Sequence, residues 1–423
     1  MATARNGRKK HGGDAEGASS SPFFNCDERL VKDLAKSYAL GHERGLMEKV
    51  IDISRISVLG QGVGSDTAGN IYFVPRALPG DTVRVAVVSQ DKKYFECELL
   101  EIVTPSKERV ESPCRYFHQC GGCDWLDWNY ADQLKGKQKV IETALKRAGL
   151  TAERVLPILE AKSPLNYRNR IQLRIGKGQL GFYKKKSHDL VDIENCQTAR
   201  PQINEEIKKI RAQGLSQADA IQKIELYLNE NGEVTNVNNE PHGADGFRQI
   251  NEEQNALLQK RLSDYVRGSH SKTVLELFCG NGNLTFAYHS LVKKIIAIDS
   301  NELAIGQAKK KRESMGIDAD TSPMAFLVDT VDRNTLRRLP AEFKGAYDTL
   351  IVDPPRGGLS GALPHLIHKQ LKHIIYISCS VQTFSQDVQF LKDQFDFKEL
   401  QPIDMFPQTR HIEFVAKFSR PSL

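Results

Sequence analysis

The chain has 423 residues, of which 40% are hydrophobic and 26% are charged, and its net charge at pH 7 is +6. These values are ordinary for a globular protein of two or three domains, and the mild basicity permits a nucleic-acid partner. No apolar run approaches the ~18 residues of a membrane helix, and no secretory pattern is present, so we expect a cytoplasmic protein with no membrane partner.

Residues 1–49 form an N-terminal extension ahead of the first strand-like segment. Basic, glycine and serine residues dominate positions 1–20, which predicts a disordered basic tail. Residues 27–50 carry scattered leucines among polar residues, and we expect one or two helices there. Neither segment suggests a function.

Residues 50–108 are expected to form a small β-barrel. Strand-like runs occur at Val50–Ile53, Asp81–Val88 and Tyr94–Val103, and the glycine-rich turn Gly60–Gly64 punctuates them. Short strands at this spacing are typical of barrels of the OB type, which commonly bind oligonucleotides. Since barrel shape is weak evidence of function, a mere spacer is the alternative.

Residues 109–245 are predicted to form a central α+β domain that contains a cluster of cysteines. Cys114, Cys120 and Cys123 lie in one short loop, and Cys196 is the best candidate for a fourth ligand. Four thiolates suit either a [4Fe–4S] cluster or zinc, and the spacing is not that of two zinc knuckles. This spacing makes zinc the less favoured of the two.

A basic strand is predicted in the same domain. Between Tyr167 and Ile175, arginines alternate with apolar residues, which suits a strand with one basic face. The lysines Lys184–Lys186 follow in an expected hairpin. Together they are a candidate phosphate-contacting surface.

Residues 246–423 alternate predicted strands with helical segments, which is typical of a doubly wound α/β sheet. The expected strands are Thr273–Phe278, Lys294–Ile298, Ala325–Val328, Thr349–Val352 and His373–Ile377. Ligands of such sheets bind beyond the carboxyl ends of the strands.

A methyl-donor pocket is predicted at these strand ends. Gly280 and Gly282 follow the first strand and let the backbone approach a ligand, and Asp299 ends the second strand, where an acid can hold ribose hydroxyls. The turn lacks the full glycine pattern of a dinucleotide site, which favours S-adenosylmethionine over a nicotinamide. Asp353, before two prolines at the end of the fourth strand, is expected in or beside the site.

A nucleophile and a base are predicted beside this pocket. Cys379 ends the fifth strand, and a thiolate that attacks C6 of a pyrimidine makes C5 able to accept a methyl group. The C5 proton must then leave, and Glu413, in the apolar terminal strand, is the candidate base. Cys279, inside the donor turn, is interpreted as structural.

Together these motifs resemble the RNA (uracil-5-)-methyltransferases, and most closely the iron–sulfur-containing 23S rRNA enzymes with a TRAM domain. The resemblance runs from about residue 50 to the end. It implies a Rossmann-like α/β methyltransferase domain, an OB-like TRAM barrel and a central α+β iron–sulfur domain. It also implies the following roles: Cys379 as nucleophile, Glu413 as general base, Gln249, Phe278, Asn283, Asp299, Asp329 and Asp353 as donor-binding residues, and Cys114, Cys120, Cys123 and Cys196 as ligands of a [4Fe–4S] cluster.

One departure from this family lies at the nucleophile, where Ser380 and Val381 replace the usual Asn-Pro pair. The expected activity is methyl transfer to C5 of a specific uridine in 23S rRNA through a Cys–C6 adduct, by a monomer. The same chemistry on tRNA is the nearest alternative. A catalytically silent RNA-binding protein and a redox protein that uses the cluster are the others.

Overall fold

The computed structural model describes residues 47–215, 221–239, 248–317, 324–339, 346–359 and 361–421. The expected basic tail and nearly all of the expected N-terminal helical segment lie outside the described residues. Positions 48–50, which were expected to end that helical segment, instead begin strand β1 (Glu48–Ile56). All three residues pair with the strand that contains Arg84–Ala86, so the barrel starts slightly earlier than predicted.

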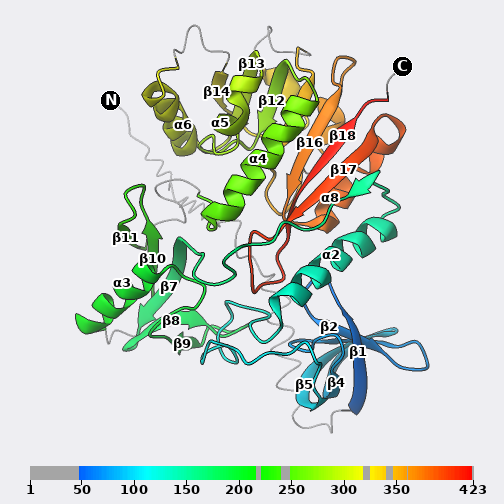
Figure 1. The fold of residues 1–423 in the computed structure, drawn as a ribbon, viewed down its shortest axis with the longest axis vertical. Coiled ribbons are helices and arrows are strands. Elements are labelled where there is room, and N and C mark those ends of the chain that lie inside the picture. The colour runs from blue at the N-terminus through cyan, green and yellow to red at the C-terminus, as the bar shows by residue number, and fades with distance from the viewer. Residues whose placement is uncertain are drawn as a thin grey trace, which may run out of the picture.

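The N-terminal strands close into a five-stranded barrel, which confirms the prediction (Figure 1). Its other strands are β2 (Gly62–Ser65), β3 (Ile71–Val74), β4 (Thr82–Asp91) and β5 (Tyr94–Thr104). Strand β2 lies in the segment that was expected to be only a turn. A Cβ atom on Gly64 would lie 2.3 Å from Cγ2 of Ile51, so the close approach of β1 and β2 requires a residue without a side chain.

A second, antiparallel sheet of five strands forms the central region, in the order β11-β10-β7-β8-β9. The strands are β7 (Arg170–Gly176), β8 (Gln179–Tyr183), β9 (Leu190–Asp192), β10 (Gln222–Leu228) and β11 (Val234–Asn238). Helix α3 (Pro201–Ala212) packs Ile203, Ile207 and Ile210 into the core of this region. Their spacing of four and three residues puts all three on one face of the helix.

The expected basic face of this sheet is not formed, so that prediction was wrong. Strand β7 lies inside the sheet, between β10 and β8, and Arg170 is only 7% exposed. Its guanidinium pairs with the carboxylate of Glu225 on β10, as a buried charge requires. Arg168 instead lines the pocket of the four clustered cysteines.

The C-terminal half contains an eight-stranded sheet in the order β14-β13-β12-β15-β16-β18-β17-β6. All five predicted strands are present, within one residue at each end. The strands are β6 (Arg154–Val155), β12 (Thr273–Leu277), β13 (Lys294–Asp299), β14 (Met324–Val328), β15 (Thr349–Val352), β16 (His373–Ser378), β17 (Asp396–Ile403) and β18 (Glu413–Ser419).

Helices cover both faces of this sheet. They are α2 (Tyr130–Arg147), α4 (Glu252–Gly268), α5 (Thr285–Tyr288), α6 (Glu302–Ser314), α7 (Thr335–Arg338) and α8 (Val381–Asp387), with the 3₁₀ turns η1 (His289–Leu291), η3 (Leu363–Leu366) and η4 (Gln389–Asp393). Neighbouring residues of β12 face opposite sides: Val274 packs in the cluster that holds Leu258 of α4, and Leu275 packs with Ile141 of α2. No helix among the described residues is long and apolar enough to cross a membrane.

Two elements that precede the central sheet join this half of the molecule. Strand β6 pairs with β17, and helix α2 packs against α8. Trp125 and Trp128 belong to the same buried cluster as Leu275, and so do Ile56 and Leu78 of the barrel. The barrel and the eight-stranded sheet therefore share one apolar cluster, and α2 lies between them (Figure 1).

Candidate active site

The predicted site residues gather at one edge of the eight-stranded sheet. Strands β12, β13, β15 and β16 are parallel, so Phe278, Asp299, Asp353 and Cys379 all follow carboxyl ends at that edge. Strand β18 is antiparallel to β16, and its first residue, Glu413, therefore reaches the same edge. The topology thus brings the donor turn, the thiol and the candidate base together.

The donor turn is held in shape by the carboxylate of Asp299. Phe278 and Gly282 have positive φ angles of 63° and 80°. The Asp299 carboxylate accepts hydrogen bonds from the backbone N–H groups of Gly280 (2.9 Å) and Asn301 (2.8 Å). The acid expected at the ribose position is therefore fixed against the glycine turn, which suits a preformed ligand site.

Three other predicted donor residues have different surroundings. Asn283 and Asn255 exchange two side-chain hydrogen bonds of 2.9 Å, which tie the donor turn to α4. The Asp329 carboxylate accepts from Nε of Arg338, and its backbone N–H donates to the carbonyl of Asp299. Gln249 lies just before α4. Its carbonyl accepts a hydrogen bond from the side-chain amide of Asn169.

The thiol of Cys379 has three charged neighbours. Burial raises its pKa to about 12, and the charges of Glu413 and Asp353 add to the rise, whereas Arg356 lowers the pKa. Arg356 also lies 3.4 Å from both ring nitrogens of His411, whose pKa falls to about 3 through burial and the nearby guanidinium. The sequence analysis assigned no role to Arg356, which follows the two prolines after Asp353, or to His411, which lies two residues before Glu413.

Asp353 and Glu413 form a carboxyl pair in this site. Burial raises the pKa of Asp353 to about 7. Burial also raises the pKa of Glu413, and the neighbouring Asp353 charge raises it further. Because two close carboxyl groups resist losing both protons, the free site keeps at least one proton on the pair near neutral pH.

The departure from the family pattern after Cys379 preserves the start of helix α8. Ser380 is the N-cap residue, and its hydroxyl accepts from the backbone N–H of Thr383. Asparagine and serine cap helices about equally well, and the first helical position, which Val381 occupies, tolerates proline because its N–H needs no partner. Ser378 adds a hydrogen bond of 3.0 Å from the N–H of Ser380. The loop that holds the thiol is thus locally well formed.

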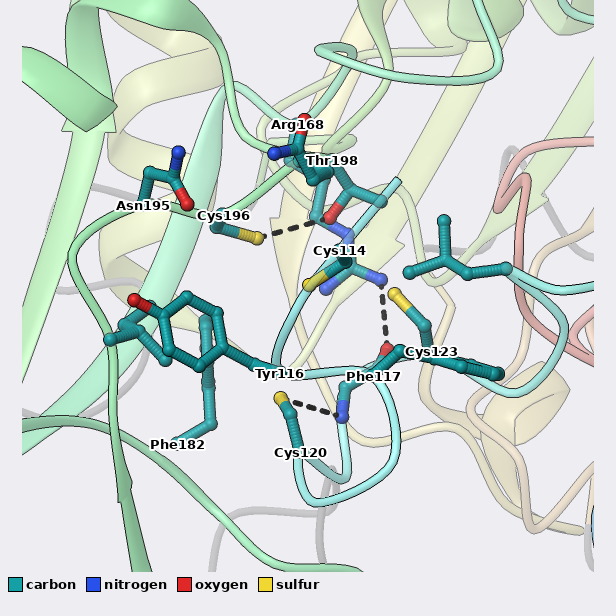
Figure 2. Close-up of a pocket in the computed structure, with 14 residues that line it drawn as sticks. Cys114, Tyr116, Phe117, Cys120, Cys123, Arg168, Phe182, Asn195, Cys196 and Thr198 are labelled. Carbon is teal, nitrogen blue, oxygen red and sulfur yellow. Dashed lines mark hydrogen bonds between the residues drawn. The ribbon is translucent and has the colours of Figure 1, made fainter. Parts of the chain in front are cut away.

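The four candidate metal ligands line a separate pocket (Figure 2). Cys114, Cys120 and Cys123 come from one loop, and Cys196 faces them from the segment after β9. All four are free thiols, and burial raises the pKa values of Cys120 and Cys123 to about 11 and 12. Within the described ranges, no three His, Cys, Asp or Glu side chains are grouped as ligands of a metal ion.

The contribution of the carboxyl pair to the stability of the folded protein should depend on pH, and Asp353→Asn tests this. The folded state binds the Asp353 proton more tightly than the unfolded state, so this stabilisation is fully present below the unfolded value of 3.8 and is lost as the pH rises through about 7. At each pH, the Tm of the unsubstituted chain is subtracted from the Tm of the variant. We expect this difference to be more positive at about pH 8 than at about pH 5, because the unsubstituted chain has lost the stabilisation by the Asp353 proton at the higher pH. An equal Tm difference at both pH values, measured without RNA or donor, would contradict the shared proton.

Comparison with known proteins agrees with this geometry. Residues 214–420 match the family described as tRNA (uracil-5-)-methyltransferase. A protein of Bdellovibrio bacteriovorus named as an RNA methyltransferase is 29% identical over 399 residues, which cover 90% of this chain and 98% of that relative. Another from Halalkalibacterium halodurans is 26% identical and covers 87% of this chain and 96% of the relative.

A solved structure shares the fold of nearly the whole chain. The tRNA (uracil-54, C5)-methyltransferase of Pyrococcus abyssi, in complex with S-adenosyl-L-homocysteine, superposes with a TM-score of 0.67 at 24% identity. The match covers 87% of this chain and 99% of that one. Residues 214–420 are thus similar to the tRNA (uracil-5-)-methyltransferase family, and the chain is an S-adenosylmethionine-dependent RNA methyltransferase.

Proposed function

We propose that this enzyme methylates C5 of a uridine in a structured RNA through a covalent bond between Cys379 and C6 of the base. One observation carries the proposal: β16 and β18 bring Cys379 and Glu413 to the same sheet edge as the donor turn. A thiol and a carboxyl group beside a methyl-donor site are the two groups that this reaction needs.

The first step is attack by Cys379. The thiol loses its proton, Sγ bonds to C6, and the electrons of the C5–C6 double bond move onto the C4 carbonyl oxygen. Arg356 favours this step because its positive charge lowers the pKa of the thiol. The uridine must leave its stack to reach the thiol, which suits a target in a loop or other unstacked region.

The second half of the reaction needs a carboxylate. C5 takes the methyl group, and the electrons of the donor's sulfur–carbon bond stay on sulfur. Glu413 then removes the C5 proton, the C5–C6 double bond returns, and the Cys379 thiolate leaves. Since the Asp353–Glu413 pair keeps a proton in the free site, Glu413 must lose any proton that it holds before it acts as base.

Replacing the nucleophile tests the first step. We expect Cys379→Ala to lower methyl transfer on the order of 10³-fold or more, since no other group supplies the covalent bond. The affinity for S-adenosylmethionine, measured by calorimetry, should stay unchanged. Retained turnover would contradict the assignment of Cys379.

Replacing the base tests the last step. We expect Glu413→Gln to form the Cys379–RNA bond but to leave it unresolved, because the C5 proton has no acceptor. A denaturing gel should then show a stable protein–RNA adduct on ordinary RNA. Release of methylated product at the normal rate would rule out Glu413 as the base.

The cysteine pocket is proposed to hold a [4Fe–4S] cluster. The side chains fit this group because the donor set is four thiolates with no histidine. The four thiols that line the pocket would be the ligands of this cluster, and the spacing of Cys114, Cys120 and Cys123 is not that of zinc knuckles. The cluster would join the cysteine loop to the segment after β9.

Metal analysis tests this pocket. We expect protein purified without oxygen to be brown and to contain about four iron and four sulfide ions per chain, and Cys196→Ser to lose most of both. Cys97→Ala is the matched control, because Cys97 is a buried free thiol in the barrel core, away from the pocket. Zinc without iron in the unsubstituted protein would contradict the cluster.

The proposed RNA target is 23S rRNA, with tRNA as the second candidate. The rRNA proposal rests on the sequence resemblance, in which a TRAM barrel and a cysteine loop accompany the rRNA enzymes. The tRNA candidate is supported by the Pyrococcus abyssi enzyme, whose fold extends over 87% of this chain. The barrel alone therefore does not separate the two targets. We propose that a cytoplasmic monomer binds either RNA with its barrel.

A further inference from the structure

We propose that the cysteine loop, defined as Cys114–Trp125, positions the general base by holding the segment that leads into β18. This base-leading segment, Asp404–Ile412, connects the end of β17 to Glu413. Asp124 is the positioning residue at the centre of the contact. The inference rests on the proposed role of Glu413 and extends it, because it gives the loop of candidate metal ligands a part in the reaction.

The two segments exchange hydrogen bonds directly. The backbone N–H groups of Asp124 and Trp125 donate to the carbonyl of Gln408 at 2.9 and 3.2 Å. In return, the backbone N–H of Arg410 donates to the Asp124 carboxylate at 3.0 Å. Lys185, from the hairpin of the central sheet, pairs with the same carboxylate at 2.6 Å. Asp124 therefore joins three separate segments.

A second connection starts inside the cysteine pocket. Arg168 lines that pocket, and it donates to the carbonyl of Gly122 in the cysteine loop and to the hydroxyl of Tyr167. The Tyr167 hydroxyl donates in turn to the carbonyl of Pro407 at 3.0 Å. The pocket is thus linked to the base-leading segment by side chains as well as by the backbone of the loop.

Helix α2 also contacts the base-leading segment. The buried ammonium of Lys137 pairs with the Asp404 carboxylate and donates to the carbonyl of Phe406 at 3.1 Å. Gln133 donates to the side-chain oxygen of Gln408 at 2.8 Å and accepts from its backbone N–H. Contacts from the cysteine loop, Tyr167 and helix α2 are therefore distributed along the base-leading segment from Asp404 to Arg410.

The backbone of this segment needs such support. Gln408 has a φ angle of +66°, in the left-handed region that residues with side chains rarely adopt. A conformation of this kind persists only when the surrounding contacts hold it. Gln408 is the residue that the cysteine loop and Gln133 contact together. Releasing it would let the segment relax and would move His411, and with it the start of β18 at Glu413.

The donor turn has contacts of its own, which do not involve Asp124. It is fixed by Asp299 and by the Asn283–Asn255 pair on the other side of the site. Loss of Asp124 should therefore slow proton removal by Glu413 while leaving donor binding intact. Slower proton removal with unchanged donor binding distinguishes a positioning residue from one that only stabilises the fold.

Comparing Asp124→Ala with Asp127→Ala tests the proposal. Asp127 lies three residues later and pairs with Arg109 instead, so it controls for loss of a partly buried carboxylate. For Asp124→Ala we expect hydrogen exchange in peptides covering 404–411 to rise, and breakdown of the covalent RNA adduct to slow, each on the order of tenfold or more. Donor affinity should match the unsubstituted enzyme. Asp127→Ala should change none of the three.

Asp124→Asn provides a second, milder variant in case the alanine variant folds poorly. It keeps a side-chain oxygen for the Arg410 N–H and loses the ion pair with Lys185, so its exchange and breakdown rates should lie between those of the other two proteins. Equal exchange and equal adduct breakdown in Asp124→Ala and Asp127→Ala would overturn the inference. If the unsubstituted enzyme forms no adduct at all, the proposed function fails instead, while the exchange comparison still decides whether the cysteine loop holds the segment.

Discussion

The antiparallel pairing of β18 with β16 is the constraint on which the candidate site depends. Four parallel strands deliver their carboxyl ends to one edge of the sheet, and these ends supply the donor turn, Asp299, Asp353 and Cys379. A further parallel strand would have carried Glu413 to the opposite edge. Because β18 reverses direction, its first residue lies beside the end of β16, and the candidate base stands next to the thiol.

This reversal has a structural consequence for the chain before it. Strand β17 must end, and the chain must turn at that same edge, before β18 can begin, so the base-leading segment lies at the edge of the sheet that holds the site. Three elements from earlier in the sequence hold it: the cysteine loop, Tyr167 and helix α2. The N-terminal part of the chain thus holds the segment that leads to Glu413, in addition to its proposed part in RNA binding.

Much of the fold could be predicted from local sequence patterns. The five strands of the methyltransferase half are short apolar runs bounded by turn residues, and such runs are recognisable without tertiary information. The barrel strands were recognised in the same way. Strand β2 was missed because Gly62 and Gly64 suggest a turn, whereas the close approach to Ala77 and Ile51 that requires them is visible only in three dimensions.

The individual site residues could be predicted from the sequence, but the interactions between them could not. Motifs identified Asp353, Cys379 and Glu413, but the carboxyl pair joins residues sixty positions apart, and its raised pKa values come from shared burial. The surroundings of Arg168 and Arg170 were misread because alternation alone cannot tell a solvent-facing arginine from one that pairs with a distant carboxylate. The role of Lys137 was likewise hidden, since its partner, Asp404, lies far along the chain.

The most direct test of the account is to identify the methylated nucleoside. Purified enzyme would be incubated with labelled S-adenosylmethionine and with unmodified 23S rRNA and tRNA transcripts side by side, and the digested nucleosides would be analysed by mass spectrometry. The account predicts 5-methyluridine as the labelled product, in the rRNA if the first candidate target is right and in the tRNA if the second is. Absence of 5-methyluridine from both RNAs, with donor bound to the enzyme, would contradict it.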